Sequence, residues 1–493
     1  MKISYIEINN FKNVRRGRIN FGLDDIKSSN IIGIYGQNGS GKTALIDALS
    51  LLKFVLCGQP IPEDYCNYIN NESDYASFVY KFLIKLQNGS NVQVRYSFAI
   101  KKEKRVVNTN VLLKTRNGQF LNTSDGNPLL APKKVDSFRI IVKDECLAYL
   151  ILDEDNGQRM KNLISTVNAE IFLPKIKYDL LIGDDENDYL ELLTSKRVCA
   201  AESRSFVFSP ELLKKIGEKN NNSNDFKNLI LSIIESIVIF GNHELFVINT
   251  SNHALISLNA LPMSFRYDND KDRQSSVGSI ALPLDKPAAI PNEQLSLVED
   301  IVSNMNIVLT ALIPDLTISV KVIGTELAQD GSSIKTIELV SHKNSEDIPL
   351  RYESEGIKKI ISILQLLIVV YNQPSITVAI DELDAGIFEY LLGELMQILD
   401  RNGKGQVIFT SHNLRPLEML NKNSLYFTTT NPFNRYVRMQ HLRPNNNQRD
   451  FYYKSILLGG QGENLYDPTD NSVISIAFRK AGRHLKRKLY LFL

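Results

Sequence analysis

Apolar and polar residues alternate along the first part of the chain, a pattern that predicts β-strands. The alternation runs from Met1 to Ile8, and its phase slips by one residue between Tyr5 and Ile6. Such a slip indicates a β-bulge, or a strand that is covered on both faces. The same reasoning predicts a turn at 9–13, strands at 17–21, 77–86, 91–101, 105–114 and 138–143, and a hairpin turn at Asn88-Gly89.

Helical spacing of apolar residues replaces this alternation in the middle of the chain. The pattern predicts helices at 147–152, 158–169, 189–196, 210–218, 225–239 and 294–312, and a mobile polar loop at 268–279. Strands follow at 317–322 and 334–341, and further helices at 356–371 and 388–399. The chain shows neither sustained heptads nor an internal repeat, so we expect no long coiled coil.

A short apolar strand at 31–35 leads into the sequence Gly-Gln-Asn-Gly-Ser-Gly-Lys-Thr, which fits the P-loop pattern G-x-x-x-x-G-K-[ST]. A helical pattern follows at once, so the strand, loop and helix occur in the order that phosphate binding requires. Lys42 is expected to reach the β- and γ-phosphates, and the Thr43 hydroxyl to bind Mg²⁺. The residues predicted to bind the nucleotide here are Gly36, Asn38, Gly39, Ser40, Gly41, Lys42 and Thr43.

A second apolar strand, at 375–380, ends in Asp381 and Glu382, which is the Walker B pattern. Asp381 can help to hold Mg²⁺ at the end of the strand, and Glu382 can orient or deprotonate the attacking water. A third apolar strand, at 405–410, ends in Ser411-His412-Asn413, where His412 suits a sensor of the γ-phosphate. These patterns together predict the hydrolysis of ATP with Mg²⁺.

Five motifs in this order resemble the ATP-binding-cassette (ABC) ATPases of the soluble branch. They are Asn10-Phe11-Lys12-Asn13, the P-loop, a signature-like Ser354-Glu355-Gly356, Asp381-Glu382 and His412. That branch holds the structural-maintenance-of-chromosomes (SMC) and RecF proteins, the overcoming-lysogenization-defect family and the small AAA ATPases of bacterial anti-phage systems. The resemblance covers about 1–100 and 315–430. It implies an α/β ABC-type P-loop NTPase domain, a mixed sheet with flanking helices and an antiparallel β lobe.

The resemblance also implies a dimer in which two chains enclose two ATP molecules. Ser354 and Gly356 of one chain would then contact the γ-phosphate held by the other chain, and a hydroxyl and an open helix N-terminus suit that contact. Glu355 departs from the usual Ser-Gly-Gly-Gln motif, and Ser354 also fits a helix-capping serine. Lys12 matches a basic residue near the nucleotide in relatives, although a surface lysine would look the same. No glutamine can be assigned to the family's Q-loop.

We divide the chain into four parts on these grounds. Residues 1–144 form the first half of the ATPase domain, 145–313 a mainly helical insert, 314–432 the second half, and 433–493 a basic extension. The extension contains aromatic residues, including Tyr452 and Tyr453. Its composition fits a nucleic-acid surface, a solvated face or a docking surface for another protein.

Composition indicates the class of protein and its cellular location, but it does not indicate an activity. With 493 residues, 43% hydrophobic and 23% charged, and a net charge of +2, the chain suits a soluble protein of several domains. Its four cysteines have no metal-ligand spacing, and no secretory signal is present, so we expect a cytoplasmic protein. The longest apolar stretch, about 360–371, is too short to span a bilayer, and no membrane partner is expected.

The first functional hypothesis is an ATPase sensor or switch subunit of a bacterial anti-phage system. It would form a homodimer or a larger homo-oligomer and control a separate effector, such as a nuclease or toxin. The extension, about 60 residues long, is too short for a Toprim nuclease domain and lacks an acidic cluster. The alternatives are a RecF- or SMC-like repair ATPase that binds DNA directly, and an ATP-binding scaffold with negligible turnover.

Overall fold

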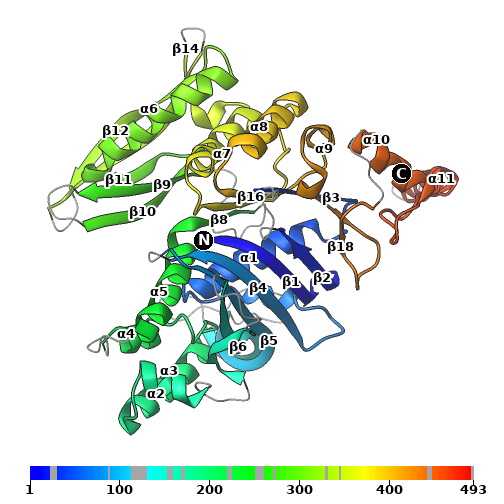
Figure 1. Ribbon diagram of the computed structural model, residues 1–493. Helices are drawn as coiled ribbons and strands as arrows, with labels where there is room; N and C mark the ends of the chain where they lie inside the picture. Colours follow the sequence, from blue (N-terminus) through cyan, green and yellow to red (C-terminus); the bar gives the residue numbers. More distant parts are fainter. Residues whose placement is uncertain are drawn as a thin grey trace.

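The computed structural model places a central sheet with flanking helices between two further groups of strands and helices (Figure 1). It describes residues 1–22, 30–86, 89–112, 130–152, 159–167, 171, 174–218, 225–249, 260–269, 274–327, 331–343, 346–440 and 447–489.

A six-stranded sheet forms the centre of the molecule, with the strand order β18-β17-β3-β16-β15-β8. The five strands from β17 to β8 run parallel, and β18 pairs antiparallel with β17. These five parallel strands are buried along their whole length, which explains why they read as continuous apolar runs. Their bounds are β3 Ile31–Tyr35, β8 Leu245–Ile248, β15 Thr377–Ile380, β16 Gln406–Thr410, β17 Leu425–Thr428 and β18 Tyr436–Val437.

Helices cover both faces of this central sheet (Figure 1). Alternate residues of β3 divide between the two faces, because successive side chains of a strand point in opposite directions. Ile32 and Ile34 share a hydrophobic core with helix α1 (Lys42–Leu56). Ile31 and Tyr35 share the opposite core with α7 (Glu355–Asn372) and α8 (Glu389–Asn402). The P-loop strand is therefore packed from both sides.

A second six-stranded sheet, the predicted antiparallel lobe, packs on the other side of α1. Its order is β2-β1-β4-β5-β6-β7, and every neighbouring pair is antiparallel. The first strand contains a bulge, but it lies just before the predicted position between Tyr5 and Ile6, since the pairing of β1 with β4 shifts register between Ile3 and Tyr5. The bounds are β1 Lys2–Phe11, β2 Val14–Asn20, β4 Tyr75–Lys85, β5 Asn91–Leu112, β6 Leu130–Ile151 and β7 Lys161–Ser165.

Two segments predicted to be helical are strands of this lobe. Residues 147–152 contain the end of β6, and 158–169 contain β7. Both segments are short, and an apolar run of that length does not by itself distinguish a strand from a buried helix. Pairing with neighbouring strands decided the outcome, as in Val92↔Ile151 and Cys146↔Ser165. The predicted turn at Asn88-Gly89 lies partly outside the described residues, but β4 and β5 pair as a hairpin around it.

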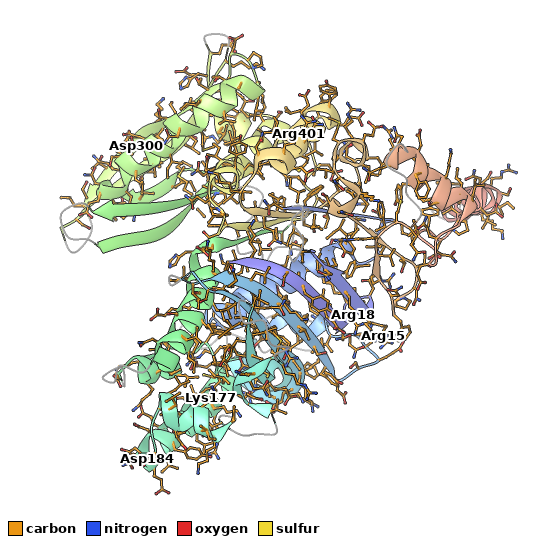
Figure 2. All side chains as sticks on the ribbon, viewed as in Figure 1. Arg15, Arg18, Lys177, Asp184, Asp300 and Arg401 are labelled. Atoms are coloured by element: carbon orange, nitrogen blue, oxygen red, sulfur yellow. The ribbon has the colours of Figure 1, made fainter. Side chains whose placement is uncertain are left out.

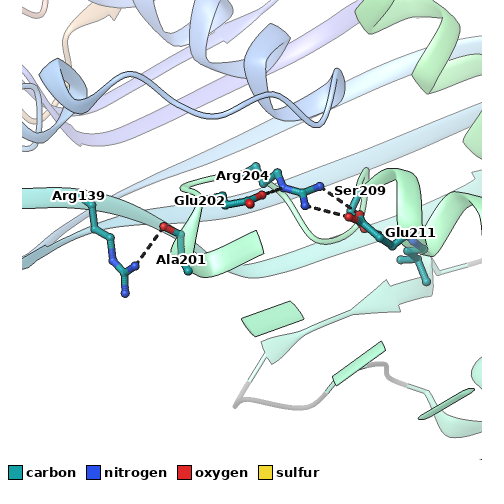
Figure 3. A network of polar contacts seen from close by, with 7 residues as sticks. Arg139, Ala201, Glu202, Arg204, Ser209 and Glu211 are labelled. Atoms are coloured by element: carbon teal, nitrogen blue, oxygen red, sulfur yellow. Dashed lines mark hydrogen bonds and ion pairs between the residues drawn. The ribbon is translucent and has the colours of Figure 1, made fainter. Parts of the chain in front are cut away.

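Four helices, which we call the arm, extend from the lobe (Figure 1). Arg204, between α3 and α4, donates to Glu202 and to both carboxylate oxygens of Glu211, while Arg139 of β6 donates to the carbonyl of Ala201 (Figure 3). These contacts fix the connection between the helices against the sheet. The arm consists of α2 Lys175–Leu181, α3 Glu186–Ala201, α4 Pro210–Glu218 and α5 Asp225–Ile239, and the π-helix Phe240–Glu244 follows it.

A third group of strands packs with α6 (Leu295–Leu312) beside α7. It contains the antiparallel pair β9 and β10, which includes 268–269 and 274–279 of the predicted loop; residues 270–273 of that loop lie outside the described residues. This stretch is mostly polar and lacks the alternation of apolar and polar residues from which a strand is predicted, so its sequence did not indicate β-structure. The strands are β9 Ala260–Asn269, β10 Gln274–Pro283, β11 Ala288–Pro291, β12 Thr317–Leu327, β13 Ser333–Lys343 and β14 Glu346–Pro349.

Residues 145–313, predicted to be a mainly helical insert, contain the helices α2 to α6 together with strands that belong to the sheets described above. This segment begins inside β6, supplies β7 to the lobe and β8 to the edge of the central sheet, and continues into β9 to β11. Residues of this segment thus contribute to both sheets and to the interface with α7. The division of the chain at 145 and 313 remains a prediction.

The remaining helices are short or lie near the C-terminus (Figure 1). One helical stretch among the described residues, Asn292–Leu312, passes a length and hydropathy test for crossing a membrane. Val298, Val302 and Met305 from this stretch pack into the core that also contains α7. The other helices are α9 Arg415–Met419, α10 Gln448–Leu458 and α11 Asn471–Leu489, with short 3-10 turns at Glu63–Asn67, Asn292–Gln294, Leu350–Tyr352 and Lys422–Ser424.

Candidate functional site

The P-loop joins β3 to α1, as the sequence predicted, and its glycines meet specific backbone demands. Gly39 and Gly41 have φ values of 73° and 97°, in the region that glycine adopts without strain. A side chain at Gly36 would place its Cβ 1.7 Å from the Thr428 hydroxyl oxygen. The loop can therefore keep this path only with glycine at these positions.

Lys42 curls back over the P-loop. Its Nζ donates to the carbonyl oxygens of Gly36, at 2.8 Å, and Gln37, at 3.0 Å. Burial lowers the pKa of Lys42, while the carboxylates of Asp381 and Glu382 oppose that shift. The ammonium group of Lys42 is thus positioned to bind an anion that enters the P-loop.

Asp381 and Thr43 face each other from opposite halves of the chain. Asp381 is buried at the end of β15 and accepts a hydrogen bond from the Thr410 hydroxyl at 2.6 Å. The Thr43 hydroxyl donates to the same oxygen of Asp381 at 3.5 Å. Adjacent oxygen ligands of an octahedral Mg²⁺ lie about 3 Å apart, so this pair fits the ion that the sequence implied. Other ligands would come from phosphate oxygens and water.

Glu382 adopts an uncommon backbone conformation, with a φ of 48°. Non-glycine residues in this region are strained, and such strain concentrates at functional sites. The Glu382 N–H donates to the Thr410 hydroxyl at 2.8 Å, which stabilises the conformation. Thr410 thus contacts both acidic residues, a role that the sequence analysis did not detect.

The segment Ser411-His412-Asn413, which we call the switch segment, forms hydrogen bonds with the loop that follows Glu382. The backbone N–H groups of His412 and Asn413 donate to Asp384 Oδ2 at 3.1 and 2.9 Å. The side chain of His412 is exposed and borders the nucleotide cavity. Asp384 was also missed, although an acid just after a Walker B pair could have drawn attention to it.

One open cavity of about 420 Å³ brings most of the predicted residues together. Its size lies within the range of small-ligand sites. The predicted residues Gly36, Ser40, Ser354 and Gly356 do not line this cavity of their own chain. The lining residues are Lys12, Asn13, Asn38, Gly39, Gly41, Lys42, Thr43, Ala44, Asp381, Glu382, Thr410 and His412.

Lys12 belongs to this cavity and is not a plain surface lysine. It lies in the tight turn between β1 and β2, forms an ion pair with the buried Asp47 of α1, and stands 4.1 Å from the ring centre of Tyr68. Burial raises the pKa of Asp47, and the Lys12 ammonium and the Asn249 amide oppose that shift. A nucleotide entering the cavity would meet an amine that is already oriented.

Asn249 is a further polar residue at this edge of the sheet. It follows β8, the strand that pairs with β15, and its side-chain amide donates to Asp47. No Q-loop glutamine could be assigned from the sequence, and Asn249 is the amide that the fold places here. Nothing in the local sequence marks it, because its position depends on the pairing of β8 with β15.

Ser354 and Gly356 lie at the N-terminus of α7. The Ser354 hydroxyl accepts from the Ile357 N–H at 3.3 Å, so the serine does cap the helix. Gly356 packs tightly on the loop after Asp384, and an added Cβ would lie 2.4 Å from the Gly386 carbonyl oxygen. Ser354 remains exposed, and is thus accessible to a second chain.

The C-terminal part of the chain forms hydrogen bonds with the P-loop and with the turn beside it. The Tyr436 hydroxyl donates to the Gly41 carbonyl at 2.8 Å, and the Asp467 N–H donates to the Gln37 side chain at 3.0 Å. Arg435 is buried and donates to the Asn13 carbonyl at 2.7 Å. Arg435 and the buried Tyr452 are therefore unavailable to a nucleic acid, whereas Arg479 and Lys480 of α11 are exposed.

Charged residues of both signs lie at well-separated points of the molecule (Figure 2). Arg15 and Arg18 lie on β2, Lys177 and Asp184 on the arm, and Asp300 on α6, at the opposite side of the molecule. The labelled residues thus do not mark a single basic face.

Two family profiles match the chain. One, described as "AAA domain", matches residues 5–237. The other, described as "AAA domain, putative AbiEii toxin, Type IV TA system", matches residues 159–418. The two matches together include the middle of the chain, which the sequence resemblance had left out. No curated protein matches.

Solved structures that resemble the chain include several SMC head domains. An SMC head bound to the C-terminal winged-helix domain of ScpA has 12% identity and a TM-score of 0.39, covering 90% of this chain and 99% of that one. The corresponding complex from Pyrococcus furiosus has 13% identity and a TM-score of 0.36, covering 89% and 96%. The SMC head from Thermotoga maritima has 15% identity and a TM-score of 0.32, covering 89% and 100%.

Proposed function

The chain belongs to the AAA-domain family described with the AbiEii toxin and type IV TA systems, and it is an ATP-binding P-loop protein; from this premise we propose that it is the ATP-hydrolysing switch subunit of a bacterial anti-phage system. One observation carries the enzymatic part of the proposal. The P-loop and the acidic end of β15, 338 residues apart in sequence, meet at one cavity through Thr43 and Asp381. The family's description supports the role in defence.

The residues of the cavity suit separate steps of hydrolysis. Lys42 and the P-loop N–H groups bind the phosphates, and Thr43 and Asp381 would hold Mg²⁺, which would supply positive charge to the phosphate oxygens. Glu382 orients or deprotonates the attacking water, and the His412 side chain senses the γ-phosphate. The strained backbone of Glu382 supports its assignment as the residue nearest the chemistry.

We further propose that two chains close around two ATP molecules. Ser354 and Gly356 lie outside the cavity of their own chain, at a helix N-terminus that can bind an anion presented by another surface. ATP thus stabilises a homodimer, alone or within a larger homo-oligomer. In the cytoplasm, this closure controls a separate effector, such as a nuclease or toxin.

Direct DNA binding is the second candidate function, and α11 is the observation that favours it. Arg479 and Lys480 are exposed on this helix, and the sequence after them adds Arg483, Lys486, Arg487 and Lys488. Tight binding of duplex DNA that weakens steeply with salt, together with ATP turnover stimulated by DNA, would favour a repair ATPase over a switch subunit.

The test of ATP hydrolysis uses Lys42→Ala and Glu382→Gln, with nucleotide affinity and turnover measured separately. Lys42→Ala should abolish binding of a fluorescent ATP analogue. Glu382→Gln should retain the affinity but lower turnover about a hundredfold or more, because the group that activates water is lost. Glu394→Gln, a change of an exposed glutamate on α8, should behave as wild type.

Two results would contradict this assignment. Unchanged affinity in Lys42→Ala would show that the P-loop does not hold the nucleotide. Intact binding without turnover in the wild type would favour a scaffold, the third hypothesis from the sequence.

A further inference from the structure

The first turns of α7 contain a buried amine that the proposed chemistry does not use. Lys359 is 5% exposed, and its Nζ has no hydrogen-bond partner among the described residues. Its neighbour Lys358 differs, because its Nζ pairs with the exposed Glu355 at 2.6 Å. A buried charge without a direct partner is costly, so its surroundings must offset the loss of hydration.

The charges that favour the ammonium form of Lys359 come from the acidic end of β15. Burial lowers the pKa of Lys359 to about 8, and the carboxylates of Asp381, Asp384 and Glu382 oppose that shift. Asp384 also contains a buried oxygen, Oδ1, without a hydrogen-bond partner in the described part of the chain. A buried cation on α7 thus acts on carboxylates that belong to the nucleotide site.

The backbone joins the same two segments. The Gly356 Cα lies against Gly386, and there is no room between them for even one methyl group. Gly386 has a φ of 77°, which a residue with a side chain rarely adopts. The signature end of α7 and the loop that contains Asp384 therefore cannot move independently. Asp384 in turn binds the N–H groups of His412 and Asn413.

We propose that Lys359 is a positioning residue that couples the signature end of α7 to Asp384 and Glu382 of the same chain. The inference rests on the proposed function, in which Ser354 and Gly356 engage ATP held by a second chain. That engagement shifts the N-terminus of α7, and the Lys359 ammonium transmits the shift to the carboxylates. Each site then hydrolyses ATP efficiently only when the opposite site is also loaded. Lys359 does not line the nucleotide cavity, so it acts through the acidic residues.

The test compares Lys359→Met, Lys359→Arg and Lys358→Met in the full-length chain. ATP turnover is measured across ATP concentrations, and affinity is measured with a fluorescent ATP analogue. Lys359→Met should lower kcat about tenfold and reduce the Hill coefficient from above 1 to 1, with affinity changed less than twofold. Lys359→Arg keeps the charge and should restore most of kcat. Lys358→Met should match the wild type, because the buried ammonium that it removes is paired with the exposed Glu355.

A second variant covers the case in which Lys359→Met fails to fold. Asp384→Asn removes one of the three carboxylate charges that favour the Lys359 ammonium while keeping the size of the side chain, and it should also lower kcat and the Hill coefficient. Normal kcat and cooperativity in a folded Lys359→Met, or in Asp384→Asn, would overturn the coupling. So would a Hill coefficient of 1 in an active wild type. A wild type that binds but never hydrolyses ATP would instead overturn the proposed function.

Discussion

Individual residues at this site are constrained by backbone geometry more than by side-chain chemistry. Glu382 lies at a positive φ, and Gly36 and Gly356 each face an atom that leaves no space for a Cβ. Gly36 belongs to a motif that the sequence displays, so its need could be foreseen. The demand on Gly356 comes from Gly386, thirty residues away in the chain, and appears only in the folded protein.

Gly356→Ala should weaken the protein and prevent ATP-driven closure. The added Cβ would lie 2.4 Å from the Gly386 carbonyl oxygen, and relief of that overlap requires a backbone shift. We expect a loss of about 1 to 3 kcal/mol in the free energy of unfolding, as for other overpacked sites. Denaturant unfolding measures this loss of stability. ATP turnover should also fall, because the backbone shift displaces the N-terminus of α7, where Ser354 and Gly356 lie.

Gly217→Ala is the matched control for that change. Gly217 lies in the helix α4, and, its own helix backbone and chain neighbours aside, no atom of the described residues lies within 4 Å of the position that its Cβ would occupy. Alanine favours a helix over glycine by about 0.5 to 1 kcal/mol, so this variant should be slightly more stable than the wild type. Equal stability and turnover in Gly356→Ala and the wild type would show that α7 and the Gly386 loop can separate freely.

At the scale of the elements, the lobe and the arm are held together by a buried carboxyl group. Glu145 of β6 accepts hydrogen bonds from the Tyr96 hydroxyl at 2.7 Å and the Phe206 N–H at 3.0 Å, and a further one from the Ser205 hydroxyl. Ser205 and Phe206 belong to the connection between α3 and α4. This segment is anchored near the Arg204 contacts of Figure 3.

Glu145 should make the stability of the protein depend on pH. Burial raises the pKa of Glu145 above its usual value of 4.5, and the hydrogen bonds oppose the shift only in part. A raised folded-state pKa means that the folded protein binds more protons than the unfolded chain. Its contribution to stability is therefore full below about pH 4.5 and is lost as pH rises through the folded-state pKa.

Thermal unfolding across pH measures that contribution. Glu145→Gln cannot ionise, so the loss of stability with rising pH should be smaller in this variant than in the wild type. Glu326→Gln, which changes an exposed residue of β12, should keep the wild-type dependence. Parallel pH curves for Glu145→Gln and the wild type would exclude Glu145 as the source.

At the scale of the whole molecule, the proposed catalytic unit consists of two chains. Glu382→Gln with ATP and Mg²⁺ should elute with twice the mass that the same variant has with ADP, because ATP stays bound between the signature and the P-loop. Light scattering after size exclusion measures the mass. Chelation of Mg²⁺ should return the smaller species, and Lys42→Ala should not respond to ATP. The same mass in all conditions would contradict closure driven by ATP.

The sequence by itself determined the elements whose pattern is local. The P-loop with its strand and helix, the acidic end of 375–382 and the switch segment follow from short motifs and continuous apolar runs. Most strands of the antiparallel lobe followed from alternation and turn residues, and the lobe itself from the family resemblance. These features depend on a few neighbouring residues, so a single amino-acid sequence was enough to predict them.

Only the tertiary structure decided the rest, because it depends on pairing between distant segments. Strand pairing turned 147–151 and 161–165 into β-structure and brought β8 to the edge of the central sheet. It placed Asn249 beside Asp47, and it put Asp384 where it could hold the switch segment. The same packing buried Lys359 within electrostatic reach of the acidic residues that follow β15, which no local pattern could predict.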